Sequence, residues 1–326
     1  MIFILNKHTD PYFNLAAEEY LLKTLKKEVF MLWRNDKAVI VGKNQNTISE
    51  IDINYVKEDD IKVVRRITGG GAVFHDLGNI NYTYIEKESE GHFNDYQHFT
   101  KGLITFLASL NVQAEQTGRN DIVIQEKKIC GNAQCVSGDL VMHHGCILYS
   151  ADLSILTNAL KSKEEKYQGR AIKSIVSRVT NIIEYLPFDK ISSEEFMIAF
   201  GNFMTENNNY DKYELTQEDI EAIEKLVNEK YSTWDWNYGS SPKYTYTNIK
   251  KFDFGLVEVS LSTTDGLISG IKIAGDFFGR MDVIELEKLL LGCRHDKEEL
   301  LEVLNDVEVD NYIVGCQKEQ LLDVIL

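Results

Sequence analysis

The stretch Arg65-Arg-Ile-Thr-Gly-Gly-Gly-Ala-Val-Phe-His-Asp76 sets three consecutive glycines between the end of a basic strand and the start of another strand. Glycine lets the backbone approach a ligand closely and aim N–H groups at phosphate oxygens, and the two arginines offset phosphate charge. A flexible or bulged hairpin is the alternative interpretation. The glycines do not open a helix and no Gly-x-x-x-x-Gly-Lys-Ser/Thr motif occurs, which argues against a P-loop or a Rossmann dinucleotide site. The stretch predicts a phosphate-binding loop between two strands.

Strand-like and helix-like segments alternate on both sides of this loop. Asp10 and Pro11 have the residue types of an N-cap and a first helical position, ahead of a helix expected over 13–25. Ser49 is the expected N-cap of a helix over 49–59, and an amphipathic helix is expected over 94–110. The expected strands are 1–5, 29–34, 38–42, 62–66, 72–75, 80–85, 112–115, 122–125, 128–130 and 146–149. This pattern predicts an α/β fold built on a mixed sheet.

The chain changes character after Pro187. Two polar helices are expected, followed by three strands and further helices; the ranges are 192–204 and 217–231 for the helices and 244–249, 256–262 and 267–273 for the strands. A length of 326 residues is enough for about two domains. We expect a main domain over 1–242, within which 187–242 is a helical connecting segment, and a small α+β accessory domain over 243–326.

Charge and composition exclude several classes of protein. The formal net charge is −16, and residues 187–326 hold 28 acidic against 13 basic side chains, so nucleic acid is not expected as the main partner. No apolar stretch approaches the roughly 20 residues that cross a bilayer, and the first residues do not resemble a secretory signal. The five cysteines form no Cys-x-x-Cys pair, which is typical of a reduced compartment. We expect a cytoplasmic protein without a membrane partner.

A second segment whose residues could take part in catalysis runs from Gly118 to Ala133. A carboxylate such as Asp121 beside phosphates makes sense with a divalent cation between them, typically Mg²⁺, although an ordinary turn aspartate is the alternative. Strand alternation predicts that Lys128 and Cys130 share one face, with the ammonium directed into a cleft lined by small residues. A solvated surface lysine is the alternative for Lys128.

The third segment is the pair His143-His144. Adjacent residues on a strand point to opposite faces, so a metal site using both histidines is not expected. One histidine is expected to line a cleft and the other to be structural. Cys130 and Cys146 are possible nucleophiles, but a free buried cysteine more often acts as a small apolar residue.

Taken together, five segments in one order resemble the lipoate-protein ligase A family. They are Arg65-Arg-Ile-Thr-Gly-Gly-Gly-Ala-Val-Phe-His-Asp-Leu-Gly-Asn79, Gly118-Arg-Asn-Asp121, Lys128-Ile-Cys-Gly-Asn-Ala133, His143-His-Gly145 and Ser177-Arg-Val-Thr-Asn181. Three further segments also resemble the family, namely Asp10-Pro-Tyr-Phe-Asn-Leu-Ala-Ala-Glu-Glu19, Val41-Gly-Lys-Asn-Gln-Asn46 and Trp234-Asp-Trp-Asn-Tyr-Gly239. The resemblance covers nearly the whole chain.

The resemblance implies a biotin/lipoate ligase-type α/β catalytic domain followed by a small C-terminal α+β domain. It also implies a reaction in two steps. Lipoate attacks the α-phosphate of ATP to give lipoyl-adenylate, and then a lysine amine of an acceptor protein displaces AMP. The acceptors implied are lipoyl domains of 2-oxo-acid dehydrogenase E2 subunits and the glycine-cleavage H protein.

The resemblance assigns roles to residues by their position in the motifs. Lys128 matches the lysine that contacts both lipoate and the α-phosphate, and it is the expected catalytic residue. Asp121 is the expected Mg²⁺ ligand. The expected ATP-binding residues are Arg66, Gly71, Ala72, Val73, Phe74 and Lys128. The expected lipoate-binding residues are Arg65, Gly70, Lys128, Ala133 and His143.

The chain departs from the family's pattern at a few positions. Thr68 stands where members often have serine, and Val176 where many have a basic residue. Cys130 and Asn132 replace serines that some members have. The change at Val176 leaves the contribution of its loop open.

Three rival functions are weighed against the ligase. An octanoyl- or lipoyl-transferase of the same fold uses a cysteine shortly before the His-Gly pair and needs no ATP. Val141 and Met142 stand there, although Cys146 keeps this alternative open. A biotin ligase would need a Gly-Arg-Gly-Arg-type loop, which is missing. A catalytically silent homologue that binds lipoate or an acceptor protein is disfavoured by the presence of Lys128, Asp121 and the three glycines.

Overall fold

The computed structural model describes the chain except for residues 89–90, 119, 161–177, 188–189, 239–245, 265 and 296. The chain divides into two compact units. The first comprises Met1–Val41, Ile48–Arg65 and Ala72–Asn237, and the second comprises Gly42–Thr47, Arg66–Gly71 and Tyr238–Leu326. None of the helices in the described part combines the length and apolar character needed to span a bilayer.

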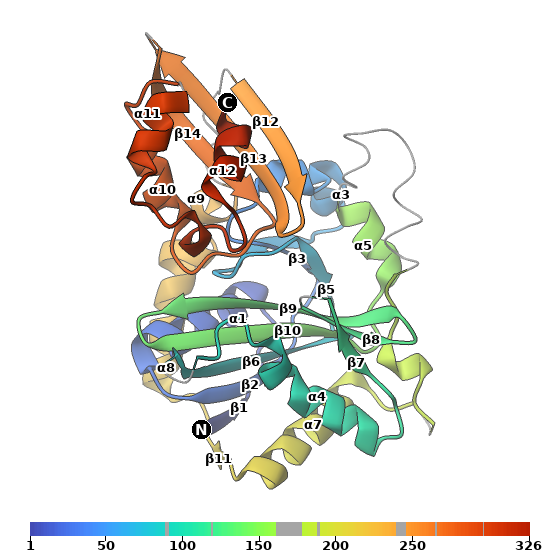
Figure 1. Ribbon diagram of the computed structural model, residues 1–326. Helices are drawn as coiled ribbons and strands as arrows, with labels where there is room; N and C mark the ends of the chain where they lie inside the picture. The colour runs from blue at the N-terminus through green and yellow to red at the C-terminus, as the bar shows by residue number, and fades with distance from the viewer. Residues whose placement is uncertain are drawn as a thin grey trace. The chain divides into compact units, whose positions relative to one another are not determined.

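A mixed sheet of eight strands forms the centre of the first unit (Figure 1). Its order is β11 (Asp211–Lys212), β1 (Ile2–Leu5), β2 (Val29–Trp33), β6 (Asn79–Lys87), β10 (Leu140–Leu148), β9 (Lys127–Ser137), β8 (Asp121–Ile124) and β7 (Glu115–Thr117). Strand β1 is parallel to both of its neighbours, whereas the pairs from β2 to β7 are antiparallel. The predicted mixed α/β fold is confirmed.

Helix α1 (Pro11–Tyr20) begins as the sequence predicts. The side chain of Asp10 accepts hydrogen bonds from the backbone N–H groups of Tyr12 and Phe13, at 2.8 and 3.3 Å, and proline occupies the first turn. The α-helical part is shorter than expected, because Leu21–Leu25 (η1) continues as a π-turn. The turn ends at Lys26, whose φ of 51° is left-handed.

The two faces of the large sheet are covered differently. Helices α4 (Tyr96–Ser109) and α7 (Ser193–Asn208) lie against one face (Figure 1), where they pack on the main hydrophobic core. That core includes Phe30, Tyr82, Tyr84, Phe99, Phe106, Ile129, Cys130, Ile147, Phe196 and Phe200. The opposite face, which we call the α1 face, carries Thr83 and His144, whose partner Glu18 lies on α1.

The two strands that flank the glycine-rich stretch form a small sheet with a third strand. Its order is β4 (Lys62–Arg65), β3 (Ala38–Val41) and β5 (Val73–His75), with β3 parallel to β4 and antiparallel to β5. The prediction of a single helix over 49–59 is wrong in detail. Two short helices form instead, α2 (Thr47–Glu50) and α3 (Ile53–Glu58), because Ile51 bridges to Leu160 and Asp52 caps the second helix.

Strands β9 and β10 are longer than the sequence indicated and form one hairpin. The polar residues Asn132, Gln134 and Ser137 interrupt the apolar pattern, but the whole of 132–137 pairs continuously with β10. Gly138 then turns the chain with a φ of 60°. The strand expected over 112–115 lies later, as β7, because Val112 is buried after the end of α4. A short helix, α5 (Leu153–Ala159), follows the hairpin.

The helices after Pro187 are part of the first unit. Helix α7 buries Phe196 and Phe200 in the main core, and α8 (Gln217–Leu226) packs on α1. Tyr20 on α1 donates a hydrogen bond to Asp219 on α8 at 2.6 Å. The chain continues through η4 (Val227–Tyr231) and α9 (Trp234–Asn237), where the first unit ends.

The second unit contains a three-stranded antiparallel sheet with helices after it (Figure 1). The sheet consists of β12 (Tyr246–Phe252), β13 (Gly255–Thr264) and β14 (Leu267–Gly275), which confirms the three predicted strands. The helices are α10 (Val283–Leu290), α11 (Lys297–Val303) and α12 (Lys318–Ile325). A separate hydrophobic core joins them to β13 and β14.

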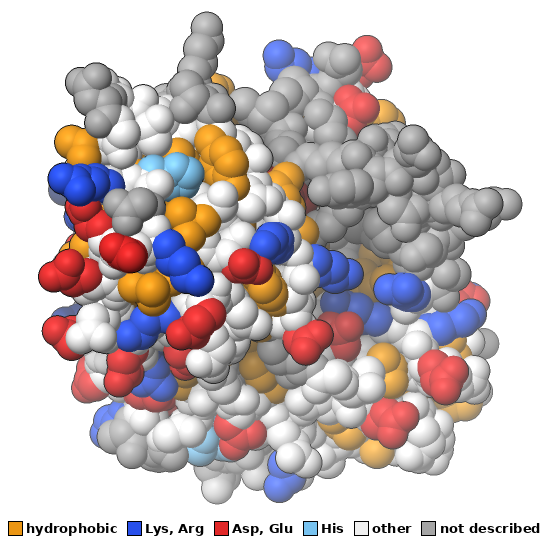
Figure 2. Space-filling model, turned by 45° about the horizontal axis from the view of Figure 1, so that its top comes forward, with side chains coloured by type: hydrophobic (Ala, Val, Ile, Leu, Met, Phe, Trp, Pro, Cys, Tyr) orange, Lys and Arg blue, Asp and Glu red, His pale blue; other side chains and the backbone are white. Residues whose placement is uncertain are grey.

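Acidic side chains are mixed with other kinds of side chain on one face of the molecule. Figure 2 shows acidic groups among basic and hydrophobic ones on the face in view. Some of the exposed hydrophobic side chains lie on or beside α10, with exposed fractions of 43–46%, namely Met281, Ile284, Leu289 and Leu291. Because acidic, basic and hydrophobic side chains are mixed in this way, the acidic groups form no single continuous surface on the part of the face that is described.

Candidate active site

The side chains of Lys128 on β9 and Asp121 on the neighbouring strand β8 meet, although the backbone of Asp121 pairs with Gly131 and that of Lys128 with Val123. Lys128 Nζ lies 2.7 Å from Asp121 Oδ1, and both side chains are 36% exposed. This partial exposure keeps the pair accessible from solvent. The two residues singled out from sequence as the catalytic lysine and the metal ligand are therefore in direct contact.

A β-bulge decides which way Lys128 points. The register of β8 against β9 shifts at Ile122/Val123, where Cys130 and then Lys128 are paired, so Ile129 is the extra residue. A Cβ at Gly131 would lie 2.7 Å from Lys128 Nζ, so the lysine side chain crosses the space that a side chain at Gly131 would fill. The prediction that Lys128 shares a face with Cys130 is wrong, because the bulge reverses the alternation and Cys130 packs in the core.

The segment Arg178–Asn181 fixes the backbone at Lys128. The N–H of Lys128 donates to the carbonyl of Arg178 at 2.7 Å, and the N–H of Thr180 donates to the carbonyl of Lys128 at 3.0 Å. Val179 and Lys128 thus form an isolated parallel bridge. Four motif positions named above, Arg119, Val176, Ser177 and Gly239, lie outside the described residues.

The residues of β9 and β10 that follow Lys128 alternate between the two faces of the sheet. Gly131 and Ala133 pair with Cys146 and His144 and lie on the α1 face with them. All four have small or half-buried side chains, and Ala133 is buried. The Lys128 side chain crosses Gly131, so it stands at one end of this row.

His143 lies on the opposite face, away from Lys128. Its ring is fully buried and stacks on Phe99 at 4.6 Å. Gln134 Nε2 lies 3.0 Å from Nδ1, and Nε2 lies 3.1 Å from Asn132 Oδ1. Burial lowers the pKa of His143 well below its ordinary value, so the ring is neutral. Of the adjacent pair, His144 is thus the histidine on the face of Lys128, and the structure does not place His143 where it could touch a ligand there.

Asn132 joins this buried network to the loop before Asp121. The Asn132 side chain donates to the carbonyl of Asn120 at 2.9 Å, and the Asn120 side chain donates back to the carbonyl of Asn132 at 2.7 Å. Tyr82 donates its hydroxyl hydrogen to Asn132 Oδ1. The network holds β9 and the Asn120–Asp121 turn in one arrangement.

A buried carboxylate on the α1 face was missed by the sequence analysis. Glu18 is fully buried, and its Oε1 lies 2.7 Å from Thr83 Oγ1 and 2.8 Å from His144 Nδ1. Its other oxygen, Oε2, has no hydrogen-bond partner within the described residues. The Thr83 hydroxyl in turn accepts from Trp33 Nε1 at 2.9 Å. Glu18 lies inside the quoted N-terminal motif, but its neighbours in space come from strands far away in sequence.

Arg65 is the last residue of β4, and its side chain points toward Trp236 and Asn237, the last residues of the first unit in sequence. Its Nε donates to the carbonyl of Trp236 at 2.9 Å, and its backbone N–H donates to Asn237 Oδ1 at 2.9 Å. Burial lowers the pKa of Arg65 to about 10, so the guanidinium stays charged at neutral pH. As the side chain stands, it holds the Trp236–Asn237 turn against the small sheet.

The three glycines belong to the second unit, with Arg66. The Arg66 guanidinium donates to the carbonyls of Gly69 and Gly71 at 2.7 and 2.8 Å, and to Thr68 Oγ1 at 3.0 Å. Gly70 has a φ of 93°, a left-handed conformation that favours glycine. Gly71 is exposed, and a Cβ there would meet nothing within 4 Å. Arg66 therefore shapes the loop, and the backbone at Gly71 is left open to solvent.

The remaining predicted ATP-binding residues continue into the first unit. Ala72 and Val73 are partly exposed, and Phe74 is buried in β5. Lys128 and Asp121 belong to the same unit.

Comparison with known proteins identifies the family. The profile described as Lipoyl protein ligase A/B catalytic domain matches residues 10–204, and that of Bacterial lipoate protein ligase C-terminus matches residues 241–325. The chain belongs to the lipoate-protein ligase family. Lipoate-protein ligase LplJ of Bacillus subtilis (strain 168) is 41% identical over 331 residues and 100% of both chains. Lipoate–protein ligase 1 of Staphylococcus aureus (strain Mu50) is 43% identical over 325 residues and 99% of both.

Solved structures of lipoate-protein ligases have the same fold. P. falciparum LipL1 in complex with lipoate has a TM-score of 0.78 at 27% identity, over 99% of this chain and 97% of that one. The archaeal bi-partite lipoate protein ligase of Thermoplasma acidophilum, studied with its E2 lipoyl domain, has a TM-score of 0.66 at 27% identity, covering 75% and 98%. Lipoate-protein ligase A bound with ATP has a TM-score of 0.62 at 26% identity, covering 73% and 98%.

The cysteines of this lipoate-protein ligase are all free thiols. Cys130 is fully buried, and burial raises the pKa of its thiol well above the ordinary value, which opposes formation of a nucleophilic thiolate. Cys146 is half-buried and accepts a hydrogen bond from Asn79 Nδ2 at 3.3 Å. The geometry gives no support to catalysis by Cys130.

Proposed function

We propose that this chain is an ATP-dependent lipoate-protein ligase that makes lipoyl-AMP and passes the lipoyl group to a lysine of an acceptor protein. The observation that carries the proposal is the Lys128–Asp121 pair, 2.7 Å apart and partly exposed at one end of the α1 face. A cation beside a carboxylate at this point suits a reaction between two anions. Family membership supports the reaction class, and the pair supports our proposal that the reaction takes place beside Lys128.

In the first step, a lipoate carboxylate oxygen attacks the α-phosphorus of ATP, and the bond to pyrophosphate breaks. Both reactants are anionic and repel each other, so the transition state needs fixed positive charge close to both. We assign this role to the Lys128 ammonium. Its backbone is fixed by the two hydrogen bonds to Arg178 and Thr180, so the side chain starts from a defined point.

Asp121 is the residue we propose as a Mg²⁺ ligand. Mg²⁺ is usually held by one or two carboxylates together with phosphate oxygens, and a single carboxylate that is 36% exposed fits that pattern. The ion would screen the charge of the triphosphate. In the structure Asp121 pairs with Lys128, so Asp121 would exchange the ammonium for the ion and release Lys128 toward the reactants.

ATP is proposed to bind along Arg66 and Gly71–Phe74. Arg66 holds the loop carbonyls inward through its hydrogen bonds to Gly69 and Gly71. The backbone at Gly71 is exposed and free of side-chain bulk, which suits close approach of a phosphate. Arg66 therefore acts on the nucleotide through the shape of the loop as well as through its charge.

The lipoyl chain is proposed to lie along the small residues of the α1 face, past Ala133 toward His144. Its carboxylate would then end at Lys128, and its apolar tail would lie near the Glu18–His144 pair. Among the residues predicted from sequence, this path uses Lys128 and Ala133 directly. Arg65 and Gly70 stay predictions, and we assign His143 a positioning role through Asn132.

In the second step, the ε-amine of an acceptor lysine attacks the carbonyl carbon of lipoyl-AMP. The amine loses a proton, the bond to AMP breaks, and an amide remains. We propose lipoyl domains of 2-oxo-acid dehydrogenase E2 subunits and the glycine-cleavage H protein as acceptors. We also propose that residues 1–242 form the catalytic domain and 243–326 the accessory domain, and that the protein works in the cytoplasm.

The test is transfer to a purified apo lipoyl domain, followed by intact mass, with lipoate and Mg²⁺ and with or without ATP. The proposal expects lipoylated acceptor only when ATP is present. A variant with Cys146→Ala should modify the acceptor normally. Transfer from a lipoyl donor without ATP that Cys146→Ala abolishes would instead establish a cysteine transferase.

A further inference from the structure

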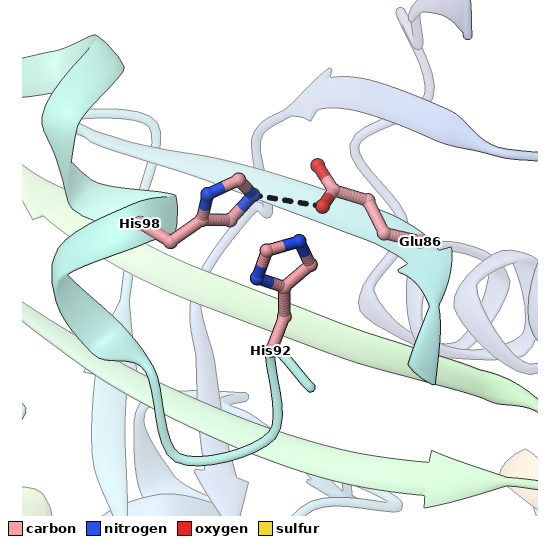
Figure 3. Close-up of side chains that lie close together, drawn as sticks. All are labelled: Glu86, His92 and His98. Carbon is pink, nitrogen blue, oxygen red and sulfur yellow. Dashed lines mark hydrogen bonds and ion pairs between the residues drawn. The ribbon is translucent and has the colours of Figure 1, made fainter. Parts of the chain in front are cut away.

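We propose that Glu86, His92 and His98 form a binding site for one divalent transition-metal ion such as Zn²⁺. The three side chains come from the end of β6, from the loop before α4 and from the first turn of α4. One ligand atom of each lies within 4.8 Å of the other two. Figure 3 shows the three side chains converging on one point, with His98 Nε2 and Glu86 Oε2 2.8 Å apart.

The set of donor atoms selects the class of ion. Two imidazoles and one carboxylate are typical ligands of Zn²⁺ and similar first-row metals, whereas Mg²⁺ and Ca²⁺ prefer oxygen alone. Three protein ligands also leave a fourth tetrahedral position for water. The cluster therefore differs in kind from the proposed Mg²⁺ ligand Asp121, and it is independent of the proposed ligase reaction.

The distances are close to what a tetrahedral ion requires. Metal–ligand bonds of about 2.0–2.1 Å place neighbouring ligand atoms roughly 3.4 Å apart. On metal binding, His98 Nε2 and Glu86 Oε2 would move slightly apart, and the His92 ring would move toward both. The two histidine rings are stacked with centroids 3.9 Å apart and planes 9° apart, and a bound metal lies near the plane of each ring. One ring must therefore turn, which the 38% exposed side chain of His98 has room to do.

The carboxylate gives a reason for a cation here. The side chain of Glu86 is only 14% exposed, and its ion-pair partner among the described residues is His98 rather than a lysine or arginine. A carboxylate that is largely removed from water is stabilised by positive charge close to it. A divalent ion shared with the two imidazoles would supply that charge.

A surface His–Glu ion pair is the alternative, and it needs only two of the three residues. The third, His92, comes from a separate loop, and Phe99 contacts both rings edge-on at 6.1 and 4.8 Å. The same Phe99 ring stacks on buried His143. A bound ion would thus tie the loop before α4 to β6, one side chain away from the His143–Asn132 network.

The experiment is a calorimetric titration of the full-length protein with Zn²⁺, in the presence of excess Mg²⁺ and without ATP. We expect one Zn²⁺ per chain at this site. We expect Glu86→Gln, His92→Asn and His98→Asn each to weaken binding by more than the roughly 10–100-fold that outer-shell partners cost. The matched control is His8→Asn, an exposed histidine in another part of the unit, which should bind as the unaltered protein does.

Two further measurements keep the result interpretable. Circular dichroism and thermal melting without Zn²⁺ check that each variant is folded, and His98→Asn alters an exposed position where folding should persist. Co²⁺ binding should give a visible spectrum without the thiolate charge-transfer band. Unchanged Zn²⁺ affinity in the folded His92→Asn and His98→Asn variants, or a thiolate band with Co²⁺, would overturn the proposal.

Discussion

Lys128 owes its position to features outside its own side chain. The extra residue Ile129 turns Lys128 onto the α1 face, and Gly131 leaves the space that the ammonium crosses. The residue types were readable from sequence, and so was the presence of a lysine at this motif position. The direction of the side chain was not, because simple alternation takes no account of a bulge that arises from pairing with β8.

Replacement of Lys128 by alanine is predicted to abolish lipoyl-AMP formation, with at least a hundredfold loss of rate. The carboxylate and the α-phosphate would lose their shared counter-charge, and tenfold in rate corresponds to about 1.4 kcal/mol. Lipoate-dependent pyrophosphate release measures this. Its matched control is Lys127→Ala, an exposed neighbour that should keep normal activity. Near-normal pyrophosphate release by Lys128→Ala would refute the assigned role.

Gly131→Ala is predicted to lower adenylation at least tenfold while the protein stays folded. The added Cβ would lie 2.7 Å from Lys128 Nζ, and the lysine end is flexible, so the side chain would move away instead of the backbone. Adenylation rate and melting temperature should be measured together. If the variant melts normally and also adenylates lipoate at the usual rate, the Lys128 conformation that crosses Gly131 is not the one used in the reaction.

The loop glycines are predicted to respond differently to alanine. Gly71→Ala should fold normally but raise the KM for ATP several-fold, because its Cβ meets no protein atom and would face an approaching phosphate. Gly70→Ala should destabilise the protein by about 1 kcal/mol or more, because its φ of 93° is left-handed. Thermal melting and ATP-dependent kinetics separate the two effects. An unchanged KM in Gly71→Ala would remove this residue from the ATP site.

At the scale of elements, helix α1 is held to η4 by a buried carboxylate. Glu19 Oε2 accepts hydrogen bonds from Lys230 Nζ and Tyr231 Oη, both at 2.6 Å. Burial alone would raise the pKa of Glu19, but these hydrogen bonds outweigh it, and the pKa is lowered below 4.5. The contact joins the first helix of the chain to the last turns of the first unit.

The lowered pKa gives this contact a pH dependence with a definite sign. The stabilisation is fully present above the ordinary pKa of 4.5 and is lost as pH falls through the lower folded-state value. Glu19→Gln imitates the protonated form. We therefore expect it to cost about 2 kcal/mol of unfolding free energy at pH 7, a cost that shrinks below about pH 4. Urea denaturation of both proteins at pH 7 and below about pH 4 measures this difference in unfolding free energy. A difference that does not change with pH would contradict the role assigned to the ionised Glu19 carboxylate.

The sequence was most informative about elements whose patterning is local. The N-cap at Asp10 and the three strands of the second unit follow from adjacent residues and were predicted. The helix over 49–59 was not, because the break depends on a bridge to Leu160. The choice between His143 and His144 likewise depends on which face packs against α4, and that is fixed by the whole sheet.

At the scale of the molecule, two loops from the N-terminal half cluster with the C-terminal residues. The N–H of Gly275 donates to the carbonyl of Asn44 at 2.7 Å, and Lys43 pairs with Asp282 at 3.0 Å. The glycine loop packs there too, since the N–H of Gly70 lies 3.4 Å from the carbonyl of Phe277. Local sequence patterns do not predict this arrangement, because these contacts join residues more than two hundred positions apart.

Deletion of residues 243–326 is predicted to impair adenylation far more than transfer from supplied lipoyl-adenylate. The loop at Gly70 and the segment at Asn44 would lose their partners, and ATP binding would suffer first. Phe278→Ala, beside Gly70, offers a milder variant with the full chain. Adenylation and transfer should be assayed separately for both, and equal loss in the two steps would contradict a specific role for this unit in ATP binding.

The ligase reaction itself is tested most directly by its first half. The purified protein is incubated with lipoate, Mg²⁺ and ATP, without any acceptor, and lipoyl-AMP is sought by mass together with lipoate-dependent pyrophosphate release. Formation of both is the predicted result. Their absence from folded protein would contradict ATP-dependent activation by this chain acting alone.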